Sequence, residues 1–237
     1  MSESRYGDVV TINGVDAYNT FNADLIEAIL EAGEVTATYS KNVGSDNFLL
    51  NNLIFGPCKL KMRFYVSGNT AKNSVLNASN LIAACKSCVI TIIDNSVEYA
   101  GILANYQIID TTVEFYQEVE LEFAMVRRLA KVTHNVASGV GSVTFDNPGN
   151  TPSGVILTIV ASSALTDVTV CGITITDLAQ DVPFIIDGIN GTVTSNSLNV
   201  FLKTDLIDFP KVVPGSNTFA FDSRVAVKFE FYPVFVV

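Results

Sequence analysis

Two of the four cysteines have a spacing that could support redox or metal chemistry. Cys85 and Cys88 form a CxxC pair, as found in thiol–disulfide enzymes and zinc sites. A redox pair needs its first thiol near the N-terminus of a helix, where the helix dipole favours the thiolate. Here the pair ends the helix expected over 70–85 and leads into a strand. We therefore predict that both thiols are reduced and pack in the core.

Other residues that could do chemistry are sparse. His134 is the single histidine and there is no second cysteine pair, so the sequence offers no set of zinc ligands. The motifs of serine hydrolases, zinc proteases, nucleotide-binding loops and dinucleotide-binding folds are missing from the sequence. We expect His134 to be exposed or hydrogen-bonded. The sequence predicts a non-enzymatic protein without metal or cofactor, although a carboxylate pair for glycoside hydrolysis would leave no mark in a sequence.

The composition excludes two classes of partner. The 237 residues include 24 Asp and Glu against 14 Lys and Arg, a net charge of −10, which argues against stable binding to nucleic acid phosphates. No apolar run approaches the roughly 18–20 residues that span a bilayer, so we expect no membrane insertion. Only 16% of the residues are charged and 49% are hydrophobic, against about 25% charged in an average domain. Part of the apolar surface is therefore expected to face partner subunits.

The first half of the chain predicts an antiparallel sheet with one packed helix. Apolar residues alternate with polar ones over 60–66, as in a half-buried strand. Over 70–85 they step by four and three residues, which predicts an amphipathic helix. A hairpin is expected over 88–101, followed by a long alternating strand over 113–125. One face of that strand carries a row of carboxylates: Glu114, Glu118, Glu120 and Glu122.

Three further segments precede the 60–66 strand. The spacing of apolar residues predicts a helix over 22–32 with Asn22 as its N-cap. A strand is expected over 35–39. The polar, asparagine-rich segment 41–52 is interpreted as a long loop or arm.

The second half of the chain shows no convincing helical pattern. Short β-rich runs are broken by turn residues at 146–150, 187–191 and 214–215, which favours a β-sandwich. We therefore predict a mainly β protein, with an N-terminal α+β domain over 1–133 and a C-terminal β-sandwich domain over 134–237.

Several segments stand in a recognisable order along the chain: Val10–Asp16, the helix over 70–85, Asp146–Pro152, and Asp208-Phe209-Pro210 followed by Val213–Phe219. In this order they resemble the siphophage distal tail proteins, which are baseplate hubs. This resemblance covers nearly the whole chain. The resemblance implies a structural protein that forms a homo-hexameric ring at the tail tip of the virion, is assembled in the host cytoplasm, and has a galectin-like C-terminal domain.

The resemblance also implies partners and candidate sites. The partners are the tail tube protein, the tail-associated hub protein and receptor-binding proteins. An inter-subunit arm is implied at Lys41, Gly44, Asp46, Asn47 and Phe48. The family motif turn is implied at Asp208, Phe209, Pro210, Pro214, Gly215 and Asn217; by turn chemistry alone this segment links two strands rather than forming a binding site.

Two alternatives stay open at this point. The carboxylate row Glu114, Glu118, Glu120 and Glu122 fits an ordinary solvated sheet face, a wall of the ring lumen that repels DNA, or an interface with basic residues such as Lys59, Lys61 and Arg63.

The chain as a whole fits either the ring protein or a carbohydrate-binding adhesin that acts through its C-terminal sandwich. The lack of tryptophan leaves only Phe and Tyr to stack on a sugar.

Overall fold

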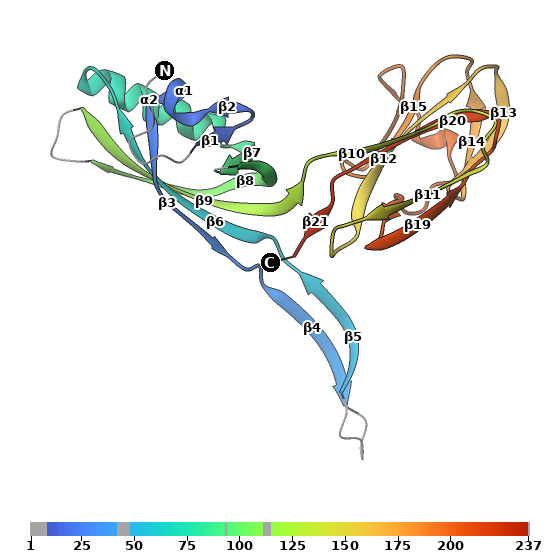
Figure 1. Ribbon diagram of the computed structural model, residues 1–237, viewed down its shortest axis with the longest axis horizontal. Helices are drawn as coiled ribbons and strands as arrows, with labels where there is room; N and C mark the ends of the chain where they lie inside the picture. Colours follow the sequence, from blue (N-terminus) through green and yellow to red (C-terminus); the bar gives the residue numbers. More distant parts are fainter. Residues whose placement is uncertain (1–8, 42–47, 93, 111–114, 237) are drawn as a thin grey trace. The chain divides into compact units, whose positions relative to one another are not determined.

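The computed structural model describes residues 9–41, 48–92, 94–110 and 115–236 (Figure 1). The chain divides into two compact units. Unit 1 comprises Met1–Arg128 with Val236–Val237, and unit 2 comprises Leu129–Phe235.

Unit 1 is built on a largely antiparallel sheet with the strand order β2-β1-β7-β8-β9-β6-β3. The alternating pattern of the sequence is realised in β6 and β9, which pair along Cys58–Ser67 with one face buried and the other in solvent. The strands are β1 (Val10–Ile12), β2 (Val15–Asp16), β3 (Ala23–Glu31), β6 (Cys58–Ser67), β7 (Ser87–Ile92), β8 (Asp94–Asp110) and β9 (Tyr116–Leu129).

Helix α2 (Ala71–Ala84) packs on the buried face of this sheet, as predicted. Its N-cap is Thr70, whose hydroxyl oxygen accepts a hydrogen bond of 3.2 Å from the Asn73 amide. Ala78 and Leu81 of the helix are fully buried against the sheet core, which includes Phe64 and Phe123. Burial of these side chains supplies most of the stabilisation of the unit.

The helix predicted over 22–32 is wrong. The chain forms a short helix α1 (Ala17–Phe21), which Asn22 ends as a left-handed C-cap with φ 49°, and continues as strand β3. Asn22 therefore ends one helix rather than starting another. A β-bulge between Leu25 and Glu27 breaks the alternation of β3, which is why its apolar residues have helix-like spacing.

Strands β4 (Val35–Lys41) and β5 (Phe48–Phe55) form a separate antiparallel hairpin between β3 and β6, which we call the arm (Figure 1). The segment 41–52 was interpreted as a long loop or an arm, and the loop is wrong for Lys41 and Phe48, which lie in the paired strands. Gly44, Asp46 and Asn47 lie outside the described residues. At the base of the arm a Cβ on Gly33 would lie 2.2 Å from the Gly56 carbonyl oxygen, so this close crossing requires glycine.

Unit 2 is a β-sandwich. The larger sheet has the order β10-β20-β12-β15-β16-β17, and the smaller sheets β11-β19 and β13-β14 enclose the same core. The elements are β10 (Val132–Val136), β11 (Ser142–Asn147), β12 (Ser153–Ala161), β13 (Leu165–Val170), β14 (Ile173–Leu178), β15 (Phe184–Asp187), β16 (Thr192–Ser195), β17 (Leu198–Asn199), the 3-10 turn η1 (Phe201–Lys203), β18 (Lys211–Val212), β19 (Gly215–Ala220), β20 (Val225–Phe231) and β21 (Val234–Phe235). The predicted fold class, a mainly β chain with an α+β part followed by a sandwich, is confirmed.

The first strand of unit 2 lies beside a strand near its C-terminal end. Strand β10 pairs antiparallel with β20, with Val132 opposite Phe231. Just outside this pair, the Leu129 amide donates a hydrogen bond of 2.9 Å to the Pro233 carbonyl oxygen. The chain therefore enters and leaves the sandwich at one place.

Candidate functional site

The predicted acidic row lies on the solvent face of the sheet in unit 1. Glu118, Glu120 and Glu122 alternate with the buried residues of β9, and all three are partly exposed. Glu114 lies outside the described residues. The alternation in the sequence therefore predicted correctly which side of the strand carries these carboxylates.

Basic residues of β6 separate this row from a second acidic row on β3. Arg63 lies opposite Glu120 of β9 on one side and Glu27 of β3 on the other. Its guanidinium forms ion pairs of 3.3 Å with both Glu118 and Glu27. We call this surface the charged face: Glu27 and Glu31 on β3, Lys59, Lys61 and Arg63 on β6, and Glu118, Glu120 and Glu122 on β9.

The second pair of the charged face joins Lys61 and Glu31 at 2.7 Å. The hydrogen bond from the Lys61 ammonium lowers the pKa of Glu31, and the same bond raises the pKa of Lys61. Both side chains are more than two-fifths exposed, so solvent screening leaves this pair little net effect on stability. Its role is to fix the arrangement of charges on the surface.

The charged face contains a hollow of about 360 Å³ between β6, β8 and β9. Its rim combines both signs of charge with polar side chains of β8. The lining includes Lys61, Arg63, Asn105, Tyr106, Gln107, Glu120 and Glu122. Such a lining suits polar contacts with another protein and offers no buried acid–base pair of the kind that catalysis needs.

The charged face is not uniformly negative. Its five carboxylates on β3 and β9 flank three cations on β6, so positive charge runs through the middle of the surface. Arg63 forms an ion pair with Glu118 within the same chain. This contact favours the interpretation that the acidic row is paired with basic residues over a row of unpaired carboxylates. The sequence analysis missed Glu27 and Glu31 because it assigned them to a helix. The segment carries no simple alternation that could have revealed them, since Ile29, between the two glutamates on the same face, is also exposed.

The arm is the other candidate interaction surface of unit 1. All residues from Glu34 to Ser40 are exposed, although they lie on both faces of the hairpin. The apolar residues Val35, Ile54 and Phe55 are each between 45% and 55% exposed. A two-stranded hairpin by itself has little stability in water, and the exposed apolar side chains described here make the arm a candidate interaction surface.

In the family-motif turn of unit 2, the polar side chain of Asn217 forms hydrogen bonds with the backbone of the turn itself. Asn217 is buried; its side-chain oxygen accepts from the Val213 amide at 2.9 Å and its side-chain nitrogen donates to the carbonyl oxygens of Val213 and Gly215 at 2.8 and 2.7 Å. Gly215 has a φ of 83°, which glycine adopts without strain. Pro214 lies in the loop that Asn217 holds.

The first part of the motif, Asp208-Phe209-Pro210, leads into β18. Asp208 is exposed, the Phe209 ring packs against the core of the sandwich, and the Pro210 carbonyl oxygen accepts a hydrogen bond of 3.3 Å from the Val155 amide. These contacts favour a linking role over a binding site.

The cysteines and the histidine form no catalytic arrangement. Cys85 caps the C-terminus of α2 and Cys88 lies in β7; both are free thiols in the core, as predicted. A hydrogen bond with Cys88, together with burial, raises the pKa of the Cys85 thiol.

The prediction for His134 is wrong: its ring stacks on Phe145 at 4.3 Å, and its Nε2 is buried without a hydrogen-bond partner among the described residues.

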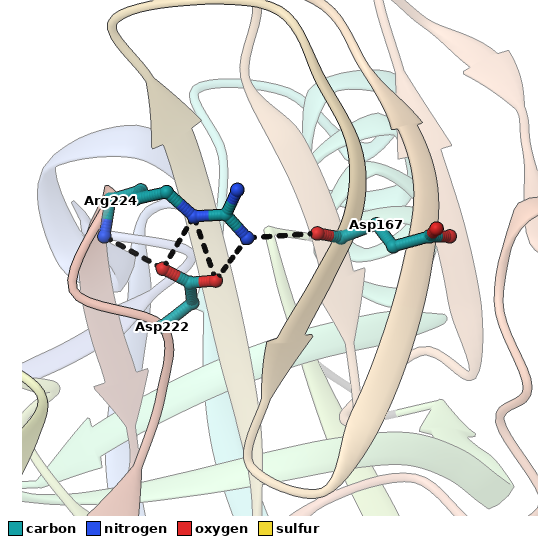
Figure 2. Close-up of polar contacts among 3 residues, drawn as sticks. All are labelled: Asp167, Asp222 and Arg224. Carbon is teal, nitrogen blue, oxygen red and sulfur yellow. Dashed lines mark hydrogen bonds and ion pairs between the residues drawn. The ribbon is translucent and has the colours of Figure 1, made fainter.

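One polar cluster of unit 2 had no signal in the sequence. The Arg224 Nε donates to both carboxylate oxygens of Asp222 at 3.0 Å, and its Nη2 donates to the Asp167 carbonyl oxygen at 3.1 Å (Figure 2). The hydrogen bonds from Arg224 lower the pKa of Asp222 to about 2. The cluster ties the turn before β20 to strand β13, and its donors are used within the chain.

Two further kinds of site have no support in the described part of the chain. No group of three or more histidine, cysteine or acidic residues there could hold a metal ion. Among the same residues, no helix is both long enough and apolar enough to cross a membrane.

Comparison with known proteins finds the same architecture in solved phage structures. No protein-family model and no curated protein matches the sequence. The crystal structure of SPP1 Dit, described as a paradigm of the hub adsorption apparatus in phages that infect Gram-positive bacteria, matches with a TM-score of 0.68 at 14% identity, covering 95% of this chain and 98% of that chain. The activated baseplate of phage P2 with calcium matches with a TM-score of 0.58 at 8% identity, covering 94% of this chain and 97% of that chain.

The same baseplate with strontium gives a TM-score of 0.57 at 8% identity. Because these matches cover 94–95% of this chain, they include residues of both units. The resemblance stated from the sequence is thereby confirmed at the level of the fold: the chain has the fold of the phage distal tail protein Dit.

Proposed function

We propose that the chain is a structural component of a bacteriophage tail tip, where it forms a hexameric ring that connects the tail tube to host-recognition proteins. The observation that carries this proposal is the match of nearly the whole chain, with both units in order, to a Dit hub protein. A fold can serve many functions, so the surfaces must support the assignment as well. Two surfaces of unit 1 do so.

The arm supports self-assembly. Its exposed apolar side chains on both faces have no core to pack against within the described part of the chain. In a closed ring each arm would lie against the next subunit, and six identical contacts would bury all six arms. Lys41 and Phe48, together with Gly44, Asp46 and Asn47, belong to this proposed contact.

The charged face is suited to line a channel through which other molecules move without binding. The charged face has more carboxylates than cations and so repels a polyanion weakly; a ring with this face toward its lumen would not retain DNA. The same pattern would suit ion pairs across a subunit boundary. Glu118, Glu120 and Glu122 stay candidates for either position.

The partners follow from the same proposal. They are further copies of this chain, a tail tube protein, a tail-associated hub protein and receptor-binding proteins. The protein acts by assembly, without catalysis or cofactor, in the virion after assembly in the host cytoplasm.

Native mass spectrometry and negative-stain imaging of the purified chain test the proposal. We expect closed sixfold rings, formed either alone or on addition of the tail tube protein. The variant Ile54→Asp with Phe55→Asp should stay folded but fail to form rings, whereas Val140→Asp, an exposed apolar position in unit 2, should assemble normally. A monomer that stays single in the presence of tube protein and binds a glycan would contradict the ring and favour the adhesin.

A further inference from the structure

The tripeptide Ile-Asn-Gly occurs twice in the sequence, once in each unit. It stands at 12–14 in unit 1 and at 189–191 in unit 2, and each copy is followed by a β-branched residue. An asparagine before a glycine is open to spontaneous deamidation, because a residue without a Cβ lets its amide nitrogen reach the asparagine side chain. Since the two copies have the same local sequence, a difference in their reactivity must come from the fold.

The deamidation reaction needs no reagent other than water. The glycine amide nitrogen gives its proton to solvent and forms a bond with Cγ of the asparagine. The bond from Cγ to Nδ2 then breaks, and this nitrogen takes up a proton from solvent and leaves as ammonia. Water opens the resulting succinimide ring at either carbonyl, which gives aspartate or isoaspartate. A reactive site therefore needs an asparagine side chain that can turn and a glycine amide that is not held elsewhere.

The fold holds the side chain of Asn13 at both of its polar atoms. Its Nδ2 donates to the Ala84 carbonyl oxygen at the end of α2, at 3.2 Å, and its Oδ1 accepts from the Val89 amide of β7, at 3.0 Å. These partners lie 71 and 76 positions later in the chain. Turning the side chain toward the Gly14 amide would break both bonds, so the fold protects this copy.

The second copy lacks such a restraint. The turn 188–191 joins β15 to β16, and the side-chain Nδ2 of Asn190 donates to the Asp187 carboxylate in the same turn, at 2.7 Å. Within the part of the chain that the structure describes, the Oδ1 of Asn190 and the Gly191 amide have no hydrogen-bond partner. Both asparagines are exposed, so access of water does not distinguish them. The distinction lies in how each side chain is held.

The single Asp-Gly pair of the sequence, Asp187-Gly188, could form the same ring with loss of water. The fold opposes this reaction at both reacting groups. The Gly188 amide donates to the Val155 carbonyl oxygen at 2.9 Å. The Asp187 carboxylate accepts from the amides of Ile189 and Asn190, each at 2.9 Å. Of the three pairs, Asn190-Gly191 alone has both a weakly held side chain and an unpaired glycine amide among the described residues.

We propose that Asn190 is a site of spontaneous modification, where the folded protein converts asparagine to aspartate and isoaspartate much faster than it does at Asn13. The inference concerns the chemistry of this chain and does not depend on the proposed tail-tip function.

The conversion changes the turn that carries it. A carboxylate at this position replaces the donor of the 2.7 Å hydrogen bond to Asp187 with a like charge, which repels it. Isoaspartate also adds a methylene group to the backbone. The turn has little room for it, because a Cβ on Gly188 would lie 2.9 Å from the carbonyl oxygens of Pro210 and Val155. The end of the β15–β16 hairpin is therefore expected to loosen.

The test follows the purified full-length chain during incubation at mildly alkaline pH in water enriched in heavy oxygen. Peptide mapping by mass spectrometry gives the rate at each asparagine, and the heavy oxygen marks only the conversions that occur during the incubation. In the folded chain we expect Asn190 to convert at least about tenfold faster than Asn13, which must break two bonds to distant elements before it reacts. In urea the two rates should become similar, because the tripeptide is the same.

Two outcomes of the mapping overturn the inference. Conversion of Asn13 as fast as that of Asn190 in the folded chain would contradict it. A ratio of rates that stays the same in urea would also contradict it, because the fold would then not be its cause.

The variant Asn190→Gln is the matched control, because a glutamine side chain forms the corresponding ring far more slowly. The unfolding midpoint of the wild-type chain should fall as conversion proceeds, whereas that of the variant should not change with time. Comparison over time removes any effect of the substitution on the starting midpoint. A wild-type midpoint as constant as that of the variant would contradict the loosening of the turn.

Discussion

Two hairpins of this chain have the same topology and opposite surroundings. The arm β4–β5 and the sandwich hairpin β13–β14 are each a two-stranded antiparallel sheet that stands apart from the larger sheets. In β13–β14 the residues Val168, Val170 and Ile175 are at most 1% exposed. In the arm all residues from Glu34 to Ser40 are exposed.

The difference lies in what each hairpin packs against. β13–β14 closes one side of the sandwich core. It is fastened at its edges by Arg224, which donates to the Asp167 carbonyl oxygen (Figure 2), and by Asp205, which accepts from the Thr174 amide. Among the described side chains of the arm, Val35, Ile54 and Phe55 are exposed. Strand pairing alone makes a hairpin marginal, so β13–β14 is part of the folding unit, whereas we propose that the arm gains its burial in a contact with another subunit.

The largest effect should come from the core of β13–β14. Ile175 is fully buried, so Ile175→Ala removes apolar contacts and leaves a cavity. We expect a loss of about 2–5 kcal/mol in the free energy of unfolding, measured by urea denaturation of the purified chain. If the free energy of unfolding falls by less than about 0.5 kcal/mol, as for a surface substitution, β13–β14 would not differ from the arm in its contribution to stability.

A smaller effect is expected at the loop before β19. Asn217→Ala removes the side chain that bonds to both the amide and the carbonyl of Val213 and to the carbonyl of Gly215. Leaving these groups unpaired in a buried turn should cost about 1–3 kcal/mol. Asn217→Asp restores only the acceptor for the Val213 amide, so denaturation should place it between wild type and Asn217→Ala. Equal stability of all three proteins would be inconsistent with this role of Asn217.

A still smaller change in stability is expected for Arg224→Ala, because this side chain is 56% exposed. The clearer readout is Asp222, whose pKa Arg224 holds at about 2. A lowered native pKa stabilises the fold above the ordinary Asp pKa of about 4, and this contribution is lost as the pH falls through the native value. NMR titration of the Asp222 carboxyl should therefore show a higher pKa in Arg224→Ala, and the two stability curves should converge at low pH. An unchanged titration would show that Arg224 does not act on Asp222.

The smallest effect should be in the arm. Ile54→Ala removes a side chain that is 55% exposed in the isolated chain, so the free energy of unfolding should stay within about 0.5 kcal/mol of wild type. The same variant should lower ring stability by native mass spectrometry, because it removes apolar area from the proposed contact. A loss of monomer stability as large as that of Ile175→Ala would erase the difference between the two hairpins.

The sequence was most informative where burial follows a simple period. Alternation over 113–125 gave the strand β9 and the side that carries Glu118, Glu120 and Glu122. Asn13-Gly14 marks a tight turn, and both residues have positive φ, 53° and 79°. Steps of four and three residues gave helix α2.

Sequence reasoning failed where distant partners decide the structure. Strand β3 forms because it pairs with β6, and a bulge in that pairing shifts its register. The local sequence over 22–32 does not reveal the distant strand on which both features depend. The row Glu27 and Glu31 was missed with it. Arg224 contacts a carbonyl 57 residues earlier in the chain, and backbone carbonyls carry no sequence signal. The arm was recognised as an extension, but its apolar strand β5 was not, because asparagines interrupt the alternation.

Strands β10 and β20 bring the beginning of unit 2 beside the strand at the end of its larger sheet. The hydrogen bond between the Leu129 amide and the Pro233 carbonyl oxygen lies just outside this pair. A recombination event could therefore exchange or lengthen the chain between β10 and β20 while it kept both strands and their pairing. The surface carried by that stretch could then change while the residues that flank it stayed the same.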